Sequence, residues 1–286
     1  MANTPWQRRM KRAKQLAAQH SFAAEILTFY AHVAGFQGDL YQRIERSSGN
    51  ANGGSLQARE LAGRQLDNRR DAGATFLDAG FSGRVAELLA AFPEFLSVIE
   101  QTAPARLAQV AQELRNEHSD LWAELLTQSW SNTAPAAEPQ DFLALAFLQP
   151  YAEFARSQVS LQIESSSSSI CPFCRRKPAC AILRPLGDGG RRSLLCSFCL
   201  TEWEFRRLLC ANCGQEDNAK LPVYTAEAFP YIRVECCDTC QTYIKSIDLT
   251  KAGLAEPIVD ELAAVPLDLW AQERGYIKVC PNLLGM

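Results

Sequence analysis

Hydrophobic residues recur at steps of three and four through the chain up to about residue 163, a spacing typical of amphipathic helices. The clearest face is formed by Phe22, Ile26, Phe29, Val33 and Phe36. Ser21 precedes this face and is placed to act as an N-cap. Further helical periods occur in RVAELLAAFPEFLSVIEQ, ARLAQVAQELRNEH, DLWAELLTQSW and DFLALAFLQPYAEFARSQ. We therefore expect six or seven helices packed on one another.

Three features interrupt this pattern. The segment from Ser47 to Ser55 is rich in Gly, Asn and Ser, which predicts a loop. Pro93 and Pro150 fall inside two of the helical segments and are expected to end or kink them. The run Ser165 to Ser169 is polar and flexible, and we interpret it as a linker between two parts of the chain.

After the linker the pattern favours short strands. AILRPL and RRSLL flank the turn Gly187–Gly190, and KLPVYTA and YIRVE flank Phe229-Pro230, so each pair predicts a hairpin. TEWEFRRLL and QTYIKSIDL are further strand-prone stretches. The segment PIVDELAAVPLDLWAQERGY is helical and amphipathic, and Pro266 should divide it into two pieces.

Cysteine spacing adds a candidate chemistry. All 11 cysteines lie at or after residue 171, and eight of them form four CxxC pairs: Cys171/Cys174, Cys196/Cys199, Cys210/Cys213 and Cys237/Cys240. Two CxxC turns at the ends of a hairpin can supply four ligands to one tetrahedral metal ion. The spacing predicts two such sites, each built from two successive pairs, and the two units repeat at a period of about 40 residues.

Alternatives to the metal interpretation are buried free thiols and a dithiol redox motif. No βαβ pattern or helix start follows any pair, which disfavours the redox motif. A crossed pairing of Cys196/Cys199 with Cys210/Cys213 is an alternative, but it leaves only ten residues between those two pairs. It would also leave Cys171/Cys174 far from Cys237/Cys240. Strand alternation predicts that Cys236 points away from the second site. Cys180 and Cys280 have no partner at ligand spacing.

Four thiolates suit zinc or a single iron, and a closed four-sulfur site leaves no open position for catalysis. An iron–sulfur cluster uses the same ligands but fits two hairpin-bridged turns less well. Cysteines kept as metal ligands indicate a reducing, cytosolic setting. His20, His32 and His118 lie on helical segments with no nucleophile, and no phosphate-binding glycine loop occurs, so we expect a protein that is not an enzyme.

Charge and hydropathy limit the partners. The net charge of −3 disfavours a protein that mainly coats nucleic acid. Residues 171–209 nevertheless contain eight basic and three acidic residues, which leaves a zinc-ribbon nucleic-acid-binding protein as an alternative. No apolar run is long enough to cross a membrane. The N-terminus has no secretory h-region; its Arg-rich character suits an amphipathic helix or an organellar transit peptide.

The run LLCSFCLTEWEFRRLLCANCGQ, together with VECCDTCQTYIKSID and VDELAAVPLDLWAQERGY, resembles the formate dehydrogenase accessory protein family, FdhE. The matching motif residues include Glu202, Trp203 and Arg207 after the second pair, Thr242, Tyr243 and Lys245 after the fourth, and Leu267-Asp268. The match is specific over about residues 171–276 and looser over the helical half. Arg175 stands where the family commonly has glycine, and Cys236 where it usually has serine.

The resemblance implies a cytoplasmic maturation factor for formate dehydrogenase that binds iron and contacts the catalytic subunit. It implies an α plus small β fold: an all-helical N-terminal domain, two tandem rubredoxin-like or zinc-ribbon modules and a C-terminal helical segment. The expected divisions are a helical domain at 1–163, a linker at 164–170, modules at 171–209 and 210–249, and a helical segment at 250–286. A redox protein that cycles iron or thiols is a further alternative.

Overall fold

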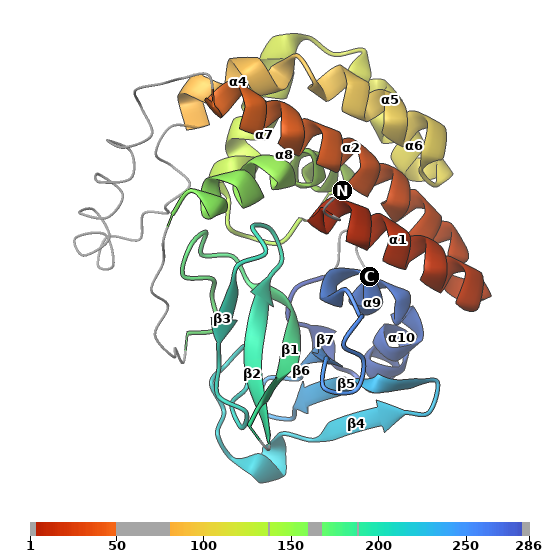
Figure 1. Cartoon of the computed structure of the whole chain (residues 1–286), viewed down its shortest axis with the longest axis vertical. Helices are drawn as coiled ribbons and strands as arrows, with labels where there is room; N and C mark the ends of the chain where they lie inside the picture. Colours follow the sequence, from red (N-terminus) through yellow and green to blue (C-terminus); the bar gives the residue numbers. More distant parts are fainter. Residues whose placement is uncertain (1–3, 50–80, 137, 160–167, 188, 282–286) are drawn as a thin grey trace. The chain divides into compact units, whose positions relative to one another are not determined.

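The computed structural model describes residues 4–49, 81–136, 138–159, 168–187 and 189–281. The chain forms two compact units (Figure 1). One consists of Met1–Ala31, Ile163–Pro172 and Arg176–Met286; the other consists of His32–Gln162 and Phe173–Arg175. The first unit contains the sheet, and the second is helical.

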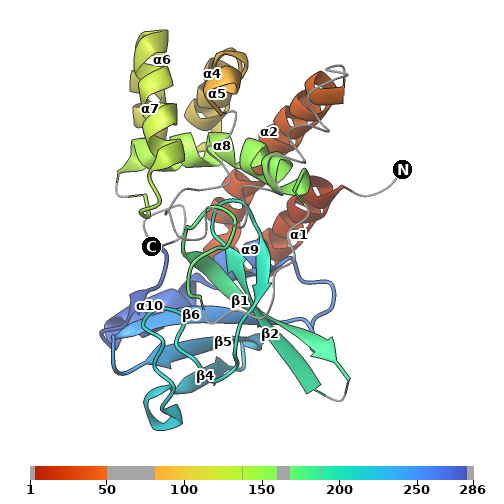
Figure 2. The ribbon, with the colours of Figure 1, turned by 90° about the vertical axis from the view of Figure 1, so that its left-hand side faces the viewer.

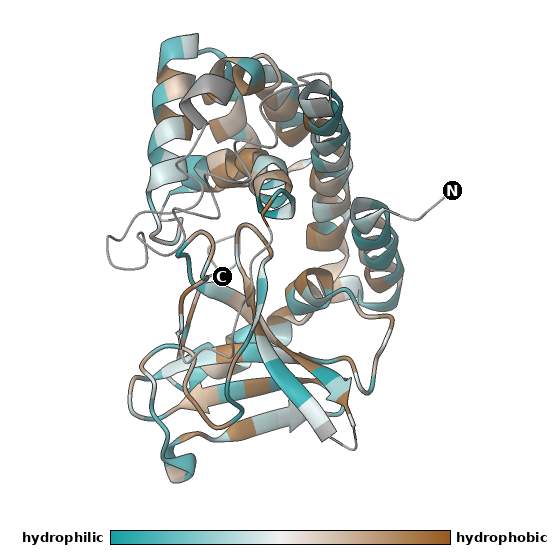
Figure 3. Cartoon of the chain, turned by 60° about the vertical axis from the view of Figure 1, so that its left-hand side comes forward, coloured by the Kyte–Doolittle hydropathy of each residue, from teal (hydrophilic) through white to brown (hydrophobic). Residues whose placement is uncertain are grey.

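The helical unit is built from amphipathic helices, which carry both hydrophobic and hydrophilic residues in Figure 3. Its helices are α2 (Ala24–Gly49, from His32 onward), α4 (Phe81–Leu89), α5 (Phe92–Thr102), α6 (Ala105–Arg115), α7 (Ser119–Ser131) and α8 (Pro139–Ser157). Aromatic rings from α5 and α8 form part of the core: the Phe147 ring centroid lies 4.9 Å from that of Phe92 and 5.6 Å from that of Phe95. The predicted helical N-terminal region is therefore confirmed.

The two prolines inside the predicted helices, Pro93 and Pro150, have different effects. Pro93 lies in the first turn of α5, so the helical segment divides there as expected. Pro150 was expected to end or kink its helix; it does not end it, because α8 continues through it to Ser157. Proline removes one helical hydrogen bond, and the long buried face of α8 offsets this local cost. Most of the predicted loop between Ser47 and Ser55 lies outside the described residues, and α2 extends to Gly49.

The start of α2 also differs from the prediction. Ser21 opens a 3₁₀ turn, Ser21–Ala23, and α2 begins at Ala24, so Ser21 does not cap this helix. Phe22 has the helical spacing of a core residue, yet its side chain is exposed. It packs instead beside Phe229, with ring centroids 6.3 Å apart.

A single sheet contains the strands of both cysteine-rich segments, and Figure 2 shows its central strands. The strands are β1 (Pro178–Leu186), β2 (Gly189–Cys196), β3 (Glu202–Glu204), β4 (Val223–Ala226), β5 (Phe229–Cys237), β6 (Thr242–Asp248) and β7 (Ile277–Lys278). Their order is β3-β2-β1-β6-β5-β4, with β7 beside β6. Two antiparallel three-stranded meanders are thus joined edge to edge by the parallel pair β1–β6. The two repeated units share one sheet.

The two hairpins form from the predicted segments, but each turn differs from the predicted one. The first turn lies after Leu186 as expected, whereas Gly189 and Gly190, predicted as part of it, pair with Leu186 and Pro185 at the start of β2. Phe229-Pro230 was expected to form the second turn, but both residues belong to β5, and Ala226 pairs with Phe229. Phe229 is buried in the core of this unit, so packing draws it into the strand.

Helices from both ends of the sequence complete the sheet unit. The helices α9 (Pro257–Ala263) and α10 (Val265–Glu273) are divided at Pro266 as predicted, and Leu267 and Ala271 of α10 pack on residues of β5 and β6. The apolar face of α1 (Pro5–Gln19) packs against α9. Arg12 of α1 also donates to Asp260 of α9, with its Nε 3.0 Å from Oδ2. As a result, Met1–Ala31 belongs to the same compact unit as the sheet.

Candidate metal centres

Each CxxC pair forms a tight turn: Cys171/Cys174 just before β1, Cys196/Cys199 at the end of β2, Cys237/Cys240 between β5 and β6, and Cys210/Cys213 in the loop between β3 and β4. The backbone N–H of the first cysteine donates to the carbonyl oxygen five residues later in three of the turns: Cys171 to Arg176, Cys196 to Thr201 and Cys210 to Gln215, each at 2.9 Å. In the fourth turn, Cys237 and Thr242 are register partners in β5 and β6. The four turns therefore share one backbone scaffold, which the strands hold in place.

The residue after the second cysteine of every pair has a left-handed backbone. The φ angles are 62° at Arg175, 51° at Leu200, 75° at Gly214 and 53° at Gln241. Only glycine adopts this region without strain, so each of the other three residues costs about 1–2 kcal/mol. The turn at Cys171/Cys174 thus forms with Arg175 in the place that Gly214 occupies in the turn at Cys210/Cys213.

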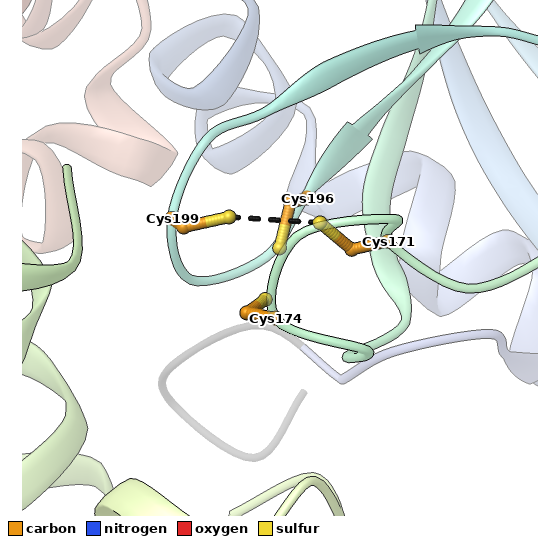
Figure 4. A group of neighbouring side chains, drawn as sticks. All are labelled: Cys171, Cys174, Cys196 and Cys199. Carbon is orange, nitrogen blue, oxygen red and sulfur yellow. Dashed lines mark hydrogen bonds between the residues drawn. The ribbon is translucent and has the colours of Figure 1, made fainter. Parts of the chain in front are cut away.

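The first cluster brings together the sulfur atoms of Cys171, Cys174, Cys196 and Cys199. All four side chains are buried, and their sulfurs lie within 4.8 Å of one another. Figure 4 shows the four side chains converging from two loops, with the sulfurs of Cys171 and Cys199 3.6 Å apart. The grouping is the one predicted from hairpin spacing.

The second cluster consists of Cys210, Cys213, Cys237 and Cys240, whose sulfurs also lie within 4.8 Å of one another. The sulfurs of Cys210 and Cys240 are 3.7 Å apart, as are those of Cys213 and Cys237. Burial differs from the first cluster, because Cys213 is exposed and Cys240 is partly exposed. The crossed pairing of the second and third CxxC turns does not occur.

Hydroxyl and amide groups surround the sulfurs. Thr201 Oγ1 lies 3.0 Å from the sulfur of Cys199, and Thr242 Oγ1 lies 3.1 Å from the sulfur of Cys240. The two threonines occupy equivalent places in the motif CxxCxT, which occurs in the closing turn of each unit. Hydrogen bonds to sulfur stabilise the thiolate form, which is the form that binds a metal.

The thiols of the second cluster have divergent proton affinities. Burial alone would raise the pKa of Cys240, but hydrogen bonds from Thr242 and Cys213 outweigh it and lower the pKa to about 6. The partial loss of solvent around its sulfur, with hydrogen bonding to Cys240 among the further causes, raises the pKa of Cys213 to about 12 although the residue is exposed. One thiolate is thus favoured within the group, and binding a cation would displace the remaining protons.

The geometry fits a single tetrahedral ion at each cluster. A metal–sulfur bond of about 2.3 Å places tetrahedral sulfurs about 3.8 Å apart. The sulfur–sulfur separations of Cys171 with Cys199, Cys210 with Cys240 and Cys213 with Cys237 are 3.6, 3.7 and 3.7 Å. Four sulfur donors suit zinc or iron, and the two clusters could hold two ions.

The other cysteines and the histidines lie apart from the two clusters. Cys236 is in the core with Tyr243 and Leu267, where burial raises its pKa to about 12. Cys180 and Cys280 are buried, and burial raises the pKa of each thiol. Among the described residues, neither these cysteines nor His20, His32 or His118 belong to a group that could hold a metal.

A buried group of charges was not predicted from the sequence. Lys245 of β6 lies 2.6 Å from Asp268 of α10 and 3.0 Å from Glu261 of α9. Lys278 of β7 contacts the same two carboxylates, at 3.1 and 2.5 Å, and Tyr243 donates to Asp268 at 2.8 Å. Tyr243, Lys245 and Asp268 are among the residues that carry the family resemblance. Their presence in those motifs was the sequence signal that could have pointed to this buried group.

Among the helices that the structure describes, none is both long enough and apolar enough to span a bilayer.

Comparisons with known proteins place the chain in a family. The family described as "FdhE, central domain" matches residues 170–207, and "FdhE, C-terminal domain" matches residues 208–284. A protein FdhE homolog from Aquifex aeolicus is 39% identical over 145 residues, which are 50% of this chain and 51% of the relative. The homolog from Stutzerimonas stutzeri is 31% identical over 202 residues, 68% of this chain and 62% of the relative. The alignments thus span between half and two thirds of these relatives' lengths.

The fold also has a solved counterpart. The crystal structure of the FdhE protein from Pseudomonas aeruginosa superposes with a TM-score of 0.68 at 23% identity, covering 99% of this chain and 96% of the other. That likeness concerns the fold, whereas the two matched domains contain all eight clustered cysteines. The chain therefore belongs to the FdhE family.

Proposed function

We propose that this protein is an accessory factor for the maturation of a formate dehydrogenase and that it binds the catalytic subunit through a metal-stabilised scaffold. The observation that carries the proposal is the match of both FdhE domains over residues 170–284, which include the two four-cysteine clusters. The protein acts in the cytoplasm, where thiols stay reduced, and its role is assembly without catalysis.

In this proposal the eight clustered cysteines are the ligands of two metal ions. The family resemblance favours iron, and zinc is the alternative for the same four-sulfur donor set. Each ion would join two CxxC turns that flank a hairpin and would neutralise thiolate charge. Structural metal ions in small domains contribute about 10–16 kcal/mol of apparent binding free energy, which becomes folding free energy. The ions would thus hold the sheet unit in the form that contacts a partner.

Binding to the catalytic subunit tests the proposal. The full-length protein, purified without oxygen, should retain the catalytic subunit from its native host, and deletion of the gene should lower formate dehydrogenase activity. A Cys210→Ser/Cys213→Ser variant should lose binding together with one equivalent of metal, whereas a Leu254→Ala variant at an exposed site should keep both. Full activity in the deletion strain would contradict the accessory role. Undiminished binding by the metal-poor variant would contradict the metal-stabilised scaffold.

The distribution of ion pairs disfavours the nucleic-acid alternative. Arg184, Arg192 and Arg206 are among the eight basic residues between 171 and 209. Each is paired with a carboxylate, at 2.7, 2.6 and 2.7 Å respectively. Arginines held by carboxylates are poorly available to phosphates. Absence of DNA or RNA binding near 50 mM salt would agree with this reading, because phosphate contacts are strongest at low salt.

A further inference from the structure

The two cysteine clusters differ in how their sulfurs meet the solvent. In the first, all four cysteines are buried. In the second, Cys213 is exposed and Cys240 is partly exposed, while Cys210 and Cys237 are buried. A bound ion would be reachable at one edge of the second cluster, through the sulfurs of Cys213 and Cys240. The ligands are of the same type, so the difference lies in access.

The residues inside the turns agree with this difference. The first cluster has CPFC and CSFC turns, and their Phe173 and Phe198 are buried. The second has CANC and CDTC turns, in which Asp238 and Thr239 are exposed and Asn212 is partly exposed. A bulky apolar side chain in the turn excludes water and incoming ligands, whereas a small polar side chain leaves them a path.

A separate observation concerns a hollow beside the second cluster. A hollow of about 130 Å³ is lined by Cys210 and Cys237 as well as by Leu208, Val223 and Arg207. Leu208, Val223 and Arg207 are all exposed. The hollow therefore leaves space beside these two buried cysteines.

We propose that the second cluster is the site at which this protein exchanges its metal ion with external sulfur-donor ligands, and that the first cluster holds its ion as a permanent structural part. This rests on the proposed metal ligation. An incoming thiolate, from a small thiol or a cysteine of another protein, binds the ion at the exposed edge. The bond from the ion to Cys213 then breaks, and the released sulfur takes a proton from water. The same exchange at Cys240 and then at the two buried ligands, Cys210 and Cys237, replaces all four protein sulfurs by incoming ones, and the ion leaves with no change of oxidation state.

Metal release from the full-length protein tests this. Protein loaded with zinc as the probe metal is mixed with excess dithiothreitol and a coloured zinc chelator, and release is followed by absorbance. One equivalent should leave at least ten times faster than the other. The fast phase should be missing in Cys210→Ser/Cys213→Ser, and the slow phase should be missing in Cys171→Ser/Cys174→Ser. Equal rates for two bound equivalents would overturn the inference while leaving the proposed ligation intact.

A variant that keeps all eight ligands tests the inference even if the cysteine variants fail to fold. Thr239→Phe places in the second cluster the aromatic residue that the first has in the same position of its turns. It should bind two equivalents and release the fast one at least threefold more slowly; an unchanged fast rate would count against access as the cause. During release, brief alkylation followed by mass analysis should label Cys213 first. Labelling of Cys174 or Cys199 first would overturn the assignment. A chain that binds no zinc at all would overturn the proposed ligation and this inference with it.

Discussion

The ammonium nitrogen of Lys245 lies 2.6 Å from Oδ2 of Asp268, and both side chains are fully buried. Lys245 also donates to the backbone carbonyl of Glu261 at 2.6 Å. The pair joins β6, which follows the last CxxC turn, to α9 and α10. Burying charges is costly, so such a group is stable only because each charge has close partners of opposite sign.

Removing the ammonium should therefore destabilise the sheet unit strongly. Lys245→Met leaves Asp268 and Glu261 with Lys278 as their remaining close cation, and we expect a loss of about 3–5 kcal/mol in the free energy of unfolding. Denaturant unfolding of the full chain measures it. Arg184→Met is a matched control, because the Arg184–Glu202 pair is partly exposed and should contribute at most about 1 kcal/mol. Similar losses in the two variants would contradict this account.

The acid dependence of stability should report on Glu261. Burial acts to raise its pKa, but Lys245 and Lys278 outweigh burial and lower the pKa to about 2 from an ordinary 4.5. A carboxyl with a lowered pKa contributes stability that is fully present above its unfolded pKa and is lost as the pH falls through the folded value. The stabilising contribution of Glu261 should thus be constant above about pH 5 and fall between about pH 4.5 and pH 2.

The comparison of wild type with Glu261→Gln isolates this contribution from acid release of metal, which affects both proteins. The difference in unfolding free energy between them should shrink as the pH is lowered through that window. A difference that is independent of pH from 7 down to 2 would show that the charge of Glu261 is not responsible.

Loss of one CxxC pair should remove one metal ion. Replacing Cys171 and Cys174 by serine leaves two sulfurs at the first cluster, too few for tight tetrahedral binding, while the second cluster keeps all four. About one equivalent should remain by emission spectrometry. The two clusters belong to one continuous sheet, so loss of both equivalents would mean that the sheet unit folds only with both ions.

The neighbouring thiols Cys236 and Cys237 should behave differently. Cys237 belongs to the second cluster, whereas Cys236 packs in the hydrophobic core. Cys236→Ser should keep the full metal content and lose some stability through burial of a hydroxyl, and Cys237→Ser should lose the second ion or bind it weakly. Emission spectrometry on freshly reduced protein measures the metal content of both variants. Equal metal loss in the two would mean that Cys236 is also a ligand.

The left-handed residue Arg175 offers a stabilising change. Its φ of 62° strains any residue with a Cβ atom, so Arg175→Gly should raise the free energy of unfolding by about 1 kcal/mol in the metal-loaded protein. Gly214 has a φ of 75°, and Gly214→Ala should lower the stability by about the same amount. Denaturation midpoints measured under one metal load compare the two. A destabilised Arg175→Gly would indicate that contacts of the arginine outweigh the strain.

Much of the candidate site was predictable because its parts are local in sequence. A CxxC turn is closed by a hydrogen bond from Cys171 to Arg176, and a hairpin brings two such turns together. Spacing alone therefore predicted which four sulfurs would meet. Each CxxC pair is followed by a residue with a left-handed backbone, but the sequence indicates this conformation only at Gly214. Arg175, Leu200 and Gln241 carry no local signal for it.

By itself, the sequence determined the helical and strand-forming halves, the four turns and their grouping, because helical periods, hairpin turns and CxxC spacing act over a few residues or one hairpin. Only the tertiary structure decided that the two repeated units share one sheet, that α1 packs on α9, and that Lys245 meets Asp268. Arg12 and Asp260 are 248 positions apart. A periodic pattern shows which face of an element is buried but not which distant face covers it, because many apolar faces are interchangeable partners until the whole chain packs.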